Sequence, residues 1–423
     1  MISVEEALSQ VMENIKPLKM VQNPILDSLG LIIGEDVKSM ISVPPTNNSG
    51  MDGYAVRHQD IVGASRNNPS TLKIIGEIAA GSTPDKALEP MTAIRVMTGA
   101  PVPPGADTVV KFEDTSDAER ISKVEEKERI SIYNSPNVGT AIRQAGEDIK
   151  PGTTVLTKGT KLTSASIGVL ASLGLDKIRV YPQPTVAIIS SGDELTAPGS
   201  SLSDGNIYDI NTYSISSLVK TYGGIPKIMG IAKDDSASLR ELIEKSREAD
   251  LIITSAGVSA GYYDLVKDVI QEYGSISVWS VRMRPGKPVV FGTLTGKSTD
   301  QWGKTVPLIG LPGNPVSAMV VSHILARPAI QKMMGKTSFE VPTVEATLDD
   351  SIVNEDGRRV YARAVVRKNS DGTYGARLAG SQGSNILTTL AKSNGLAICP
   401  ENVKELPAGS KVIVELIDQQ LIL

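Results

Sequence analysis

Short apolar runs alternate with glycine-bearing loops from Val186 to Met319, and this alternation constrains the fold more than any other feature of the chain. The runs Val186–Ile189, Leu251–Thr254 and Val306–Ile309 each lead into a loop and are predicted to be buried strands. Helix-like segments separate these units, which is typical of a parallel α/β sheet. In such a sheet, ligands bind at the carboxyl ends of the strands, where glycine lets the backbone approach them closely.

Four loops of this region are candidates for a binding site: Ser190–Leu195, Ser255–Gly261, Arg284–Pro288 and Gly310–Pro315. The loop Arg284–Pro288 differs from the others because it precedes an apolar run, Val289–Phe291, instead of following one. Together the loops carry carboxylates beside basic residues. That mixture suits a phosphate-bearing substrate handled with the help of a metal ion.

Composition limits the chemistry. The chain has 423 residues, enough for three or four domains, with 40% hydrophobic and 21% charged residues, an ordinary globular balance. Its formal net charge of −4 gives no overall field that would attract nucleic acid. One cysteine, Cys399, and two histidines, His58 and His323, exclude a cysteine-based or multi-histidine zinc site. Any metal must therefore sit on carboxylates, as Mg²⁺ does.

The start of the chain, Met1–Glu6, is acidic and lacks the pattern of a signal peptide. No apolar stretch reaches membrane-spanning length. We therefore expect a cytoplasmic protein with no membrane partner.

The expected fold class is multidomain α/β, in four parts. Residues 1–44 and 140–183 form a mixed linking domain, which begins with a capping box at Ser3 and Glu6. Residues 45–139 form a β-rich domain inserted into it, since this segment is rich in Gly, Pro and Thr with short alternating strands. Residues 184–335 form a central parallel α/β domain. Residues 336–423 contain short strands separated by turns and form a C-terminal β-barrel.

Three local features of the α/β domain have simple interpretations. The segment Asn211–Tyr222 is predicted to be a helix with Asn211 as its N-cap. The segment Gly292–Ser298 is similar to a phosphate-binding Walker A loop but has one residue too few between its glycines, so we interpret it as a surface turn. His323 lies in an apolar run and is predicted to be a helix residue without a catalytic role.

Carboxylates follow the predicted strands at one edge of the sheet. They are Asp193 with Glu194, Asp234 with Asp235, and Asp264. Acids that converge repel one another unless a cation compensates, so the cluster predicts Mg²⁺. The alternative, that these are solvated loop acids and helix caps, stays open, and Asp235 fits a cap best.

The basic and glycine-rich loops supply the opposite charge and backbone donors. Arg282, Arg284 and Lys287 surround a Pro-Gly turn, and guanidinium groups match phosphate or oxyanion geometry. A solvated hairpin would explain the same spacing. The loop from Gly257 to Gly261, with Ser259, leads into a helix and could cradle an anion with its amides.

Further polar corners occur elsewhere. In the loop after the third strand, Gly313 and Asn314 lie between Pro312 and Pro315, which hold the loop rigid as a binding wall or as a plain turn. In the N-terminal half, Asp52 lies between two glycines in a predicted tight loop, where an acidic side chain without a role would be unfavourable. The segments Met97–Pro101 and Arg143–Asp148 also place polar groups at glycine-bearing corners, a weak signal in each case.

Six segments in this order resemble the molybdopterin molybdotransferase family, the MoeA-type enzymes related to the E domain of gephyrin. The segments that carry the resemblance are Asn48–Ala55, Thr98–Pro101, Gly146–Asp148, Ser191–Leu195, Pro285–Pro288 and Leu311–Pro315. They span nearly the whole chain.

The resemblance implies four domains, a homodimer, and insertion of molybdate into adenylylated molybdopterin with release of AMP, with the α/β domain binding molybdopterin. The family's acids fall on Asp52, Asp148, Glu194, Asp234 and Asp264, and Thr98 also matches a catalytic position. Glu194, Asp234 and Asp264 would hold Mg²⁺. The substrate-binding positions that we assign are Arg143, Ser191, Gly192, Gly257, Ser259, Arg284, Lys287, Pro312, Gly313, Asn314 and Pro315.

The resemblance also implies that the Asp52 region of one subunit faces the α/β domain of the other, and it makes a molybdopterin adenylyltransferase a candidate partner. Two lysines common in the family fall on Ser280 and Arg284, so only the second position keeps its charge. Tungstate is an alternative to molybdate. Two other functions stay open: a pterin- or nucleotide-pyrophosphate-processing enzyme, and a non-catalytic gephyrin-like scaffold, against which the clustered acids argue.

Overall fold

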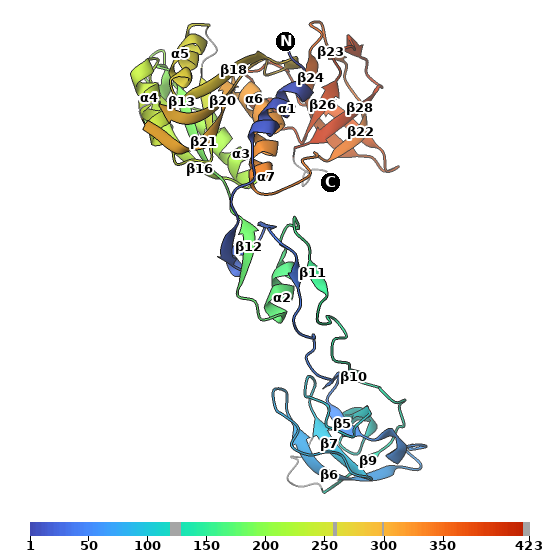
Figure 1. Cartoon of the computed structure of the whole chain (residues 1–423). Helices are drawn as coiled ribbons and strands as arrows, with labels where there is room; N and C mark the ends of the chain where they lie inside the picture. Colours follow the sequence, from blue (N-terminus) through green and yellow to red (C-terminus); the bar gives the residue numbers. More distant parts are fainter. Residues whose placement is uncertain (119–127, 257–259, 298–299, 418–423) are drawn as a thin grey trace. The chain divides into compact units, whose positions relative to one another are not determined.

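A computed structural model describes residues 1–118, 128–256, 260–297 and 300–417 (Figure 1). The chain divides into two compact units: an N-terminal unit of residues 23–178, and a C-terminal unit of residues 179–423 that residues 1–22 join. Among the described residues, no helix combines the length and the apolar character that crossing a membrane requires.

The N-terminal unit contains a five-stranded sheet with strand order β8-β5-β7-β6-β9. Its strands are β5 (Gly53–Val56), β6 (Ser70–Ile78), β7 (Thr92–Val96), β8 (Thr108–Lys111) and β9 (Arg129–Ile132). Side chains of Tyr54, Leu72, Phe112 and Ile130 form its apolar core. The β-rich segment that the sequence predicts is therefore present.

Short elements make up the rest of this unit and the crossing to the next. Helix α2 (Ser164–Ser172) begins after Thr163, whose side chain caps it. Two-stranded ladders join β3 (Val37–Lys38) to β11 (Thr154–Leu156) and β4 (Asn48–Ser49) to β10 (Ile142–Arg143). A three-stranded sheet combines β1 (Val21–Pro24), β12 (Lys177–Tyr181) and β2 (Ile32–Ile33).

The C-terminal unit is built on a six-stranded sheet with strand order β16-β13-β17-β21-β20-β18. Its strands are β13 (Thr185–Ser191), β16 (Ile225–Ala232), β17 (Leu251–Ala256), β18 (Gly274–Ser280), β20 (Pro288–Lys297) and β21 (Asp300–Pro312). The predicted strands are confirmed, and the sheet has a parallel core with two antiparallel strands at one side. β16, β13, β17 and β21 are parallel, whereas β20 and β18 run antiparallel to their neighbours.

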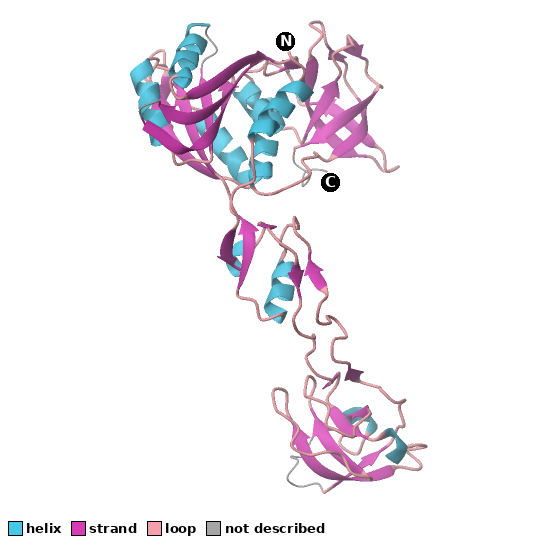
Figure 2. Ribbon diagram, in the orientation of Figure 1, coloured by secondary structure: helices cyan, strands magenta, loops and turns pink. Residues whose placement is uncertain are grey.

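Helices cover both faces of this sheet (Figure 2). The side chains of β13 show how both faces become covered, because successive residues of a strand point to opposite faces of the sheet. Val186 and Ile188 pack with α3 (Asn211–Tyr222), α6 (Pro315–Val321) and α1 (Val4–Asn14). Ala187 and Ile189 pack with α4 (Ser236–Lys245) and α5 (Ala260–Gln271). The strand is therefore apolar throughout, as a doubly covered sheet requires.

Two local predictions in this domain are wrong. Gly292–Lys297 is not a surface turn but the second half of β20, paired with β21. Asn211 is the first residue of α3, whose N-cap is Ile210. By contrast, the capping box of Ser3 and Glu6 at the start of α1 is confirmed.

The last part of the chain is a closed five-stranded barrel, as predicted. Its strands are β22 (Thr343–Leu348), β24 (Arg359–Lys368), β25 (Tyr374–Leu378), β26 (Gly395–Cys399) and β28 (Lys411–Leu416). The barrel closes because β24 pairs with both β25 and β26. Short β19 (Met283–Arg284) pairs with β24 and connects the barrel to the α/β domain. Helix α8 (Leu387–Ala391) contacts α6. Cys399 is buried and forms no disulfide.

Candidate active site

The strand order of the α/β sheet reverses at β13, and this reversal marks a candidate site. From β13 the chain passes to β16 on one side and then returns to β17 on the other. Loops that leave two adjacent strands in opposite directions open a crevice at their carboxyl ends, where α/β proteins bind ligands. The rule therefore predicts a crevice beyond Ser191 and Ala256, which are paired at the ends of β13 and β17.

The loop after β13 directs a carboxylate toward this crevice. Gly192 has φ of 147°, and a Cβ atom there would lie 2.6 Å from Oε2 of Glu194. The positive φ favours glycine at this position, and the Glu194 carboxylate lies directly against it. Glu194 is exposed, so its carboxylate is free to meet a ligand from solvent.

The loop after β16 brings a second carboxylate to the same place. Ser191 Oγ donates a hydrogen bond to Asp234 Oδ1 at 3.4 Å, and the Asp234 amide donates to Asp193 Oδ1 at 3.3 Å. Asp235 instead caps α4 by accepting from the amide of Ser238 at 2.8 Å, which confirms its interpretation as a cap. Glu194 and Asp234 thus lie on adjacent loops at one edge of the sheet, as the sequence predicts.

The third predicted acid lies partly outside the described residues. Asp264 falls in the first turns of α5, but its side chain is outside the described set, as are Gly257 and Ser259. Among the side chains that the structure describes, no group of three potential metal ligands occurs. The described part of this edge therefore holds Glu194 and Asp234 with Asp193 beside them, but not in the geometry of a complete metal site.

Asn211 ties two of the site loops together, a role that the sequence did not reveal. Its Nδ2 donates to Ser255 Oγ at 2.6 Å, at the end of β17, and to the Gly313 carbonyl at 2.7 Å, after β21. Its Oδ1 is buried and has no hydrogen-bond partner among the described residues. That unpaired acceptor is available to a donor on a ligand.

Beneath the site lies a buried polar cluster that the sequence also did not predict. Asp209 is only 3% exposed and accepts from Ser190 Oγ at 3.1 Å and from the Thr212 amide at 3.0 Å. Thr212 Oγ1 lies 2.7 Å from Ser190 Oγ. These bonds fix the end of β13 to the start of α3. The only signal in the sequence was the spacing, since Asp209 precedes Thr212 in the first turn of α3 by three residues.

The loop after β21 connects that strand directly to α6. Pro312 ends the strand, Asn314 is the N-cap residue of α6, and Pro315 is its first residue, a position that proline favours. Gly313 places its carbonyl within reach of Asn211. The loop therefore forms one wall of the crevice.

The basic turn at Arg284–Pro288 reaches the same edge because β20 is antiparallel. Val290 pairs with Gly310, so the start of β20 lies beside the end of β21. Gly286 has φ of 107°, and a Cβ atom there would lie 2.5 Å from Val321 on α6. Lys287 is exposed. A loop that precedes its strand therefore lies at the same edge as the loops that follow the parallel strands.

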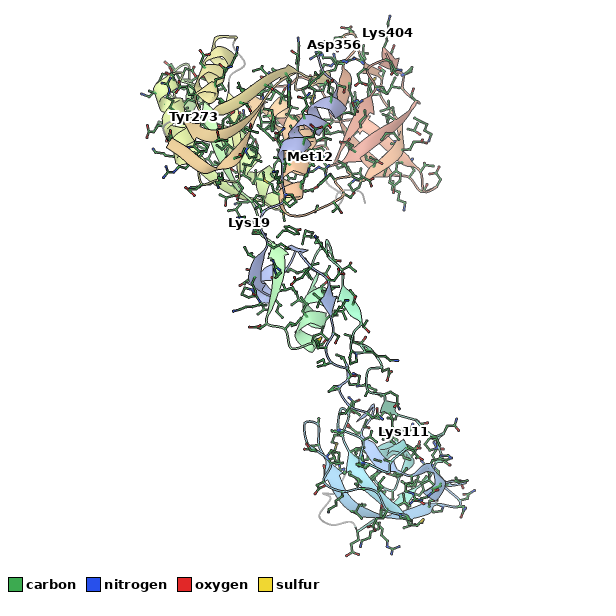
Figure 3. All side chains as sticks on the ribbon, in the orientation of Figure 1. Met12, Lys19, Lys111, Tyr273, Asp356 and Lys404 are labelled. Atoms are coloured by element: carbon green, nitrogen blue, oxygen red, sulfur yellow. The ribbon has the colours of Figure 1, made fainter. Side chains whose placement is uncertain are left out.

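The side chain of Arg284 takes a direction that the sequence did not predict. Its Nη2 donates to the Val353 carbonyl at 2.6 Å, and its Nη1 lies 3.7 Å from Oδ2 of Asp356 (labelled in Figure 3). The hydrogen bond from Arg358 holds the pKa of the Asp356 carboxyl below its usual range, and the nearby Arg284 charge adds to this effect. The expected convergence of Arg284 with the acids is therefore not observed, since its guanidinium contacts the barrel.

Beside Arg284 lies a cleft of about 350 Å³ that the barrel and the basic turn form together. Pro285, Tyr361, Arg363 and Gln382 also line it. Arg363 is 1% exposed, and its guanidinium donates to main-chain carbonyls of the Ser381–Gly383 loop. Burial without a carboxylate partner lowers the pKa of Arg363 to about 10. The cleft is thus bordered by two cations.

In the N-terminal unit, the structure joins two of the predicted residues. Asp52 Oδ1 accepts from the Thr98 amide at 2.8 Å and from its hydroxyl at 2.7 Å. Arg143 is exposed on β10, opposite Asn48 in the register. Asp148 lies on another loop, where its amide donates to the Val43 carbonyl at 3.0 Å. Asp52 and Thr98 therefore form one constellation. Among the described residues, no hydrogen bond connects Asp148 to either of them.

Comparisons with known proteins match this architecture along the chain. The family model of the MoeA N-terminal region (domain I and II) matches residues 2–174. A model described as a probable molybdopterin binding domain matches residues 187–332, and that of the MoeA C-terminal region (domain IV) matches residues 345–417. The order and extent of these matches define a protein of the MoeA architecture.

Similar proteins cover almost the entire chain. Molybdopterin molybdenumtransferase 2 of Mycobacterium tuberculosis is 36% identical over 98% of this chain and 99% of its own length. The molybdopterin molybdenumtransferase of Haemophilus influenzae is 32% identical over 98% of both chains. The crystal structure of a molybdopterin biosynthesis MoeA protein from Pyrococcus horikoshii has a TM-score of 0.80 at 32% identity and covers 98% of both chains. The chain belongs to the molybdopterin molybdenumtransferase (MoeA) family of transferases.

Proposed function

We propose that this protein acts in molybdenum cofactor biosynthesis by inserting molybdate into adenylylated molybdopterin with release of AMP. The observation that carries the proposal is the edge of the sheet at the end of β13, where Glu194 and Asp234 lie on adjacent loops. Such an edge binds phosphate-bearing ligands in α/β proteins. The names of the relatives supply the class of substrate.

Mg²⁺ would be held by Glu194, Asp234 and Asp264. The donors fit a hard cation, since Glu194 and Asp234 present exposed carboxylate oxygens. Of the described lysines and arginines, none forms an ion pair with either group. Mg²⁺ usually takes one or two carboxylates and completes its shell with water and substrate phosphates. When bound, the ion would neutralise charge on the phosphates of the pterin nucleotide.

Backbone and amide groups would orient the pterin nucleotide. Ser191 and Gly192 present the end of β13, and Asn211 offers its unpaired Oδ1 beside Gly313. The loop after Ala256 would add amides for a phosphate. Because Asn211 holds its neighbours by two hydrogen bonds, it acts here as a positioning residue as well as an acceptor.

Molybdate, or tungstate in its place, would bind beside the basic turn. The cleft next to Arg284 has Arg363 in its wall, and Lys287 is exposed on the same turn. Fixed cations stabilise an oxyanion without reorganisation. Asp356, which now shares Arg284, would be displaced by or compete with the oxyanion.

A shared site in a homodimer would give the Asp52 constellation its role. Asp52 and Thr98 would complete the site of the partner subunit, with Arg143 and Asp148 on neighbouring loops, and a molybdopterin adenylyltransferase would deliver the nucleotide. Mixing inactive Asp52→Ala with inactive Asp264→Ala would then restore part of the activity, since a heterodimer holds one intact site. No recovery despite proven subunit exchange would contradict a shared site.

The direct test supplies the purified protein with adenylylated molybdopterin and molybdate and measures AMP and the metal-loaded pterin. Asp264→Asn is expected to remove most of the turnover, whereas Asp268→Asn, one turn further along α5 and exposed, is expected to retain it. Folding of both variants is checked by their urea midpoints. AMP release without any dependence on molybdate would instead favour a pyrophosphate-cleaving enzyme.

A further inference from the structure

A cavity with a volume of about 480 Å³ lies between the α/β domain and the barrel. Most of its wall is apolar, with side chains from α3, α6 and α8 and from the barrel strands β26 and β28. These side chains include Leu218, Met319, Leu387, Leu390, Leu396 and Leu416. The described residues that line the cavity include none of the candidate active-site residues. Its volume lies within the range of protein binding sites, and its wall suits an occupant that is mostly apolar.

The last strand of the barrel leads directly into this cavity. Leu416, the last residue of β28, and Ile417 both line it. The segment Asp418-Gln419-Gln420-Leu421-Ile422-Leu423 follows Ile417 and lies outside the described residues. An extended chain spans at most about 3.6 Å per residue, so these six residues reach at most about 22 Å. Residues 418–423 are therefore attached at the cavity wall and are long enough to return along it.

The sequence of residues 418–423 matches the character of the cavity wall. Leu421, Ile422 and Leu423 are three consecutive apolar residues, and the three residues before them are polar. Transfer of apolar side chains from water to an apolar wall is favourable. A segment with three such side chains that is attached beside an apolar cavity therefore has a driving force to enter it.

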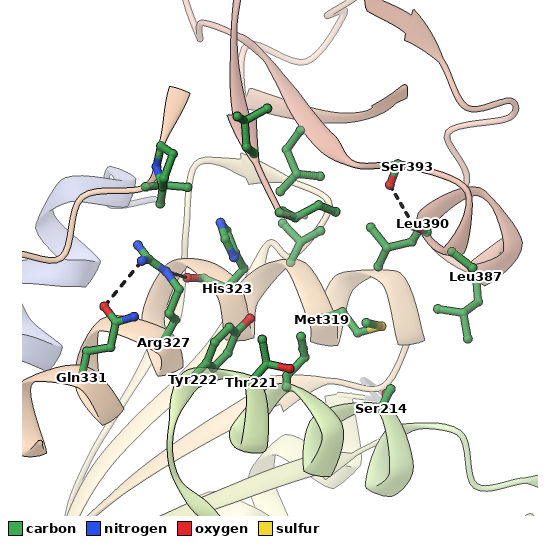
Figure 4. Close-up of a pocket in the computed structure, with 18 residues that line it drawn as sticks. Ser214, Thr221, Tyr222, Met319, His323, Arg327, Gln331, Leu387, Leu390 and Ser393 are labelled. Atoms are coloured by element: carbon green, nitrogen blue, oxygen red, sulfur yellow. Dashed lines mark hydrogen bonds between the residues drawn. The ribbon is translucent and has the colours of Figure 1, made fainter. Parts of the chain in front are cut away.

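Polar groups at one end of the cavity require both donors and acceptors. The Tyr222 hydroxyl, His323 Nε2 and Glu415 Oε2 are buried and form no hydrogen bond among the described residues. Figure 4 shows Tyr222 and His323 close to Arg327 at this end. The Glu415 carboxylate, 3.4 Å from His323 Nε2, offsets the charge of Arg327, so no net charge selects an anion or a cation. A peptide segment fits this balance, because each backbone amide and each glutamine side chain both donates and accepts.

We propose that residues 418–423 bind in this cavity, with the side chains of Leu421–Leu423 against Met319, Leu387 and Leu390, and so connect the barrel to the α/β domain. Met319 lies on α6 of the α/β domain, whereas Leu387 and Leu390 lie on α8, so a bound segment contacts both sides of the cavity. Attachment at Ile417 favours this occupant over a free ligand or the segment of a second copy, because a short tether gives an effective concentration on the order of millimolar. The proposal does not depend on the proposed function, since it uses none of the residues that would handle the pterin nucleotide.

The first test combines Leu421→Ser, Ile422→Ser and Leu423→Ser in the whole chain. Thermal unfolding is followed by tryptophan fluorescence, since both tryptophans lie in the α/β domain. Loss of the buried apolar side chains is expected to lower the melting temperature by about 5 °C. The control is Leu202→Ser, which changes a leucine that is 48% exposed in the same domain and should lower the melting temperature by no more than about 2 °C. An unchanged melting temperature in the triple variant would overturn the proposal.

A crosslinking test locates the segment. Mild oxidation of a chain with Leu387→Cys and Ile422→Cys is expected to form a disulfide within one chain, because the proposal places these two side chains together. The control pairs Ile422→Cys with Leu202→Cys, which does not line the cavity, and should crosslink at least about tenfold more slowly. Equal rates for the two pairs would contradict the proposal. A disulfide between two chains as the main product would also contradict it, since the cavity would then hold the segment of a second copy.

Discussion

Replacing Asn211 tests whether hydrogen bonds between loops keep the site in position. Its two hydrogen bonds join loops that are far apart in the chain. Asn211→Ala removes the bonds to Ser255 and Gly313. Each bond stabilises the fold by about 1 kcal/mol. The buried and unpaired Oδ1 disappears with the side chain, which offsets part of the loss. We therefore expect the free energy of unfolding of this domain to fall by about 1–2 kcal/mol.

Activity should fall by more than this loss of stability suggests. Without Asn211, the ends of β17 and β21 lose their only described side-chain tie, and displacements of about 1 Å near a reacting centre cost about 100-fold in rate. We expect kcat/KM to fall roughly 10- to 100-fold at temperatures where the variant is fully folded. The fall should appear in both KM and kcat, since the side chain positions loops and also offers an acceptor.

The stability assay is direct because both tryptophans of the chain, Trp279 and Trp302, lie in the α/β domain. Urea unfolding followed by tryptophan fluorescence thus reports on the domain that Asn211 belongs to. The matched control is Asn206→Ala, which removes one 3.2 Å hydrogen bond to Thr196 in the same domain. It should change stability by less than about 1 kcal/mol and leave activity unchanged. If Asn211→Ala lost stability as expected but kept its kcat and KM, the positioning role would be refuted.

Two further predictions concern the basic turn and its carboxylate partner. Arg284→Ala should raise the molybdate concentration for half-maximal rate about tenfold, whereas Ser280→Ala, an exposed residue at the end of β18, should not; equal responses would argue against Arg284 as an oxyanion ligand. Asp356 has its pKa lowered mainly by the hydrogen bond from Arg358, so its stabilising effect is present at neutral pH and is lost as the pH falls through that lowered pKa. The free energy of unfolding of Asp356→Asn, measured by urea titration, should be below that of the native chain near neutrality by no more than about 1 kcal/mol, and the difference should shrink as the pH falls. A difference that stayed constant into the acid range would contradict the assignment.

Local patterns in the sequence predicted local structure well. The capping box at Ser3 and the cap at Asp235 join residues three apart, so their partners are readable from spacing alone. The apolar runs of β13, β17 and β21 predicted buried strands correctly. Strands of a sheet that is covered on both faces are apolar along their whole length. The apolar run of β20, Val289–Phe291, did not indicate whether the strand runs parallel or antiparallel to β21. An antiparallel strand with both faces buried has the same composition as a parallel one.

What the sequence could not predict depends on partners far along the chain. Asn211 was interpreted as an N-cap because asparagine is common at that position. Its hydrogen-bond partner Gly313 lies 102 residues later in the chain. Arg284 was expected to face the acids, yet it contacts Val353, 69 residues later on the barrel. The buried Asp209 gave no signal of burial, since acids before helices are usually solvated. Burial and long-range hydrogen bonds are properties of the packed fold and not of a local pattern.

The antiparallel direction of β20 has a functional consequence. A parallel strand at that position would place the basic turn at the amino edge of the sheet, far from Glu194 and Asp234. Because β20 runs back from β18, the turn before it meets the end of β21, and Gly286 packs against α6 at the same edge. The loops that carry the acids and the turn that carries the basic residues therefore lie at a single edge of the sheet, although the guanidinium of Arg284 turns away to Val353. That topology lets one sheet present both the groups suited to a metal and those suited to an oxyanion.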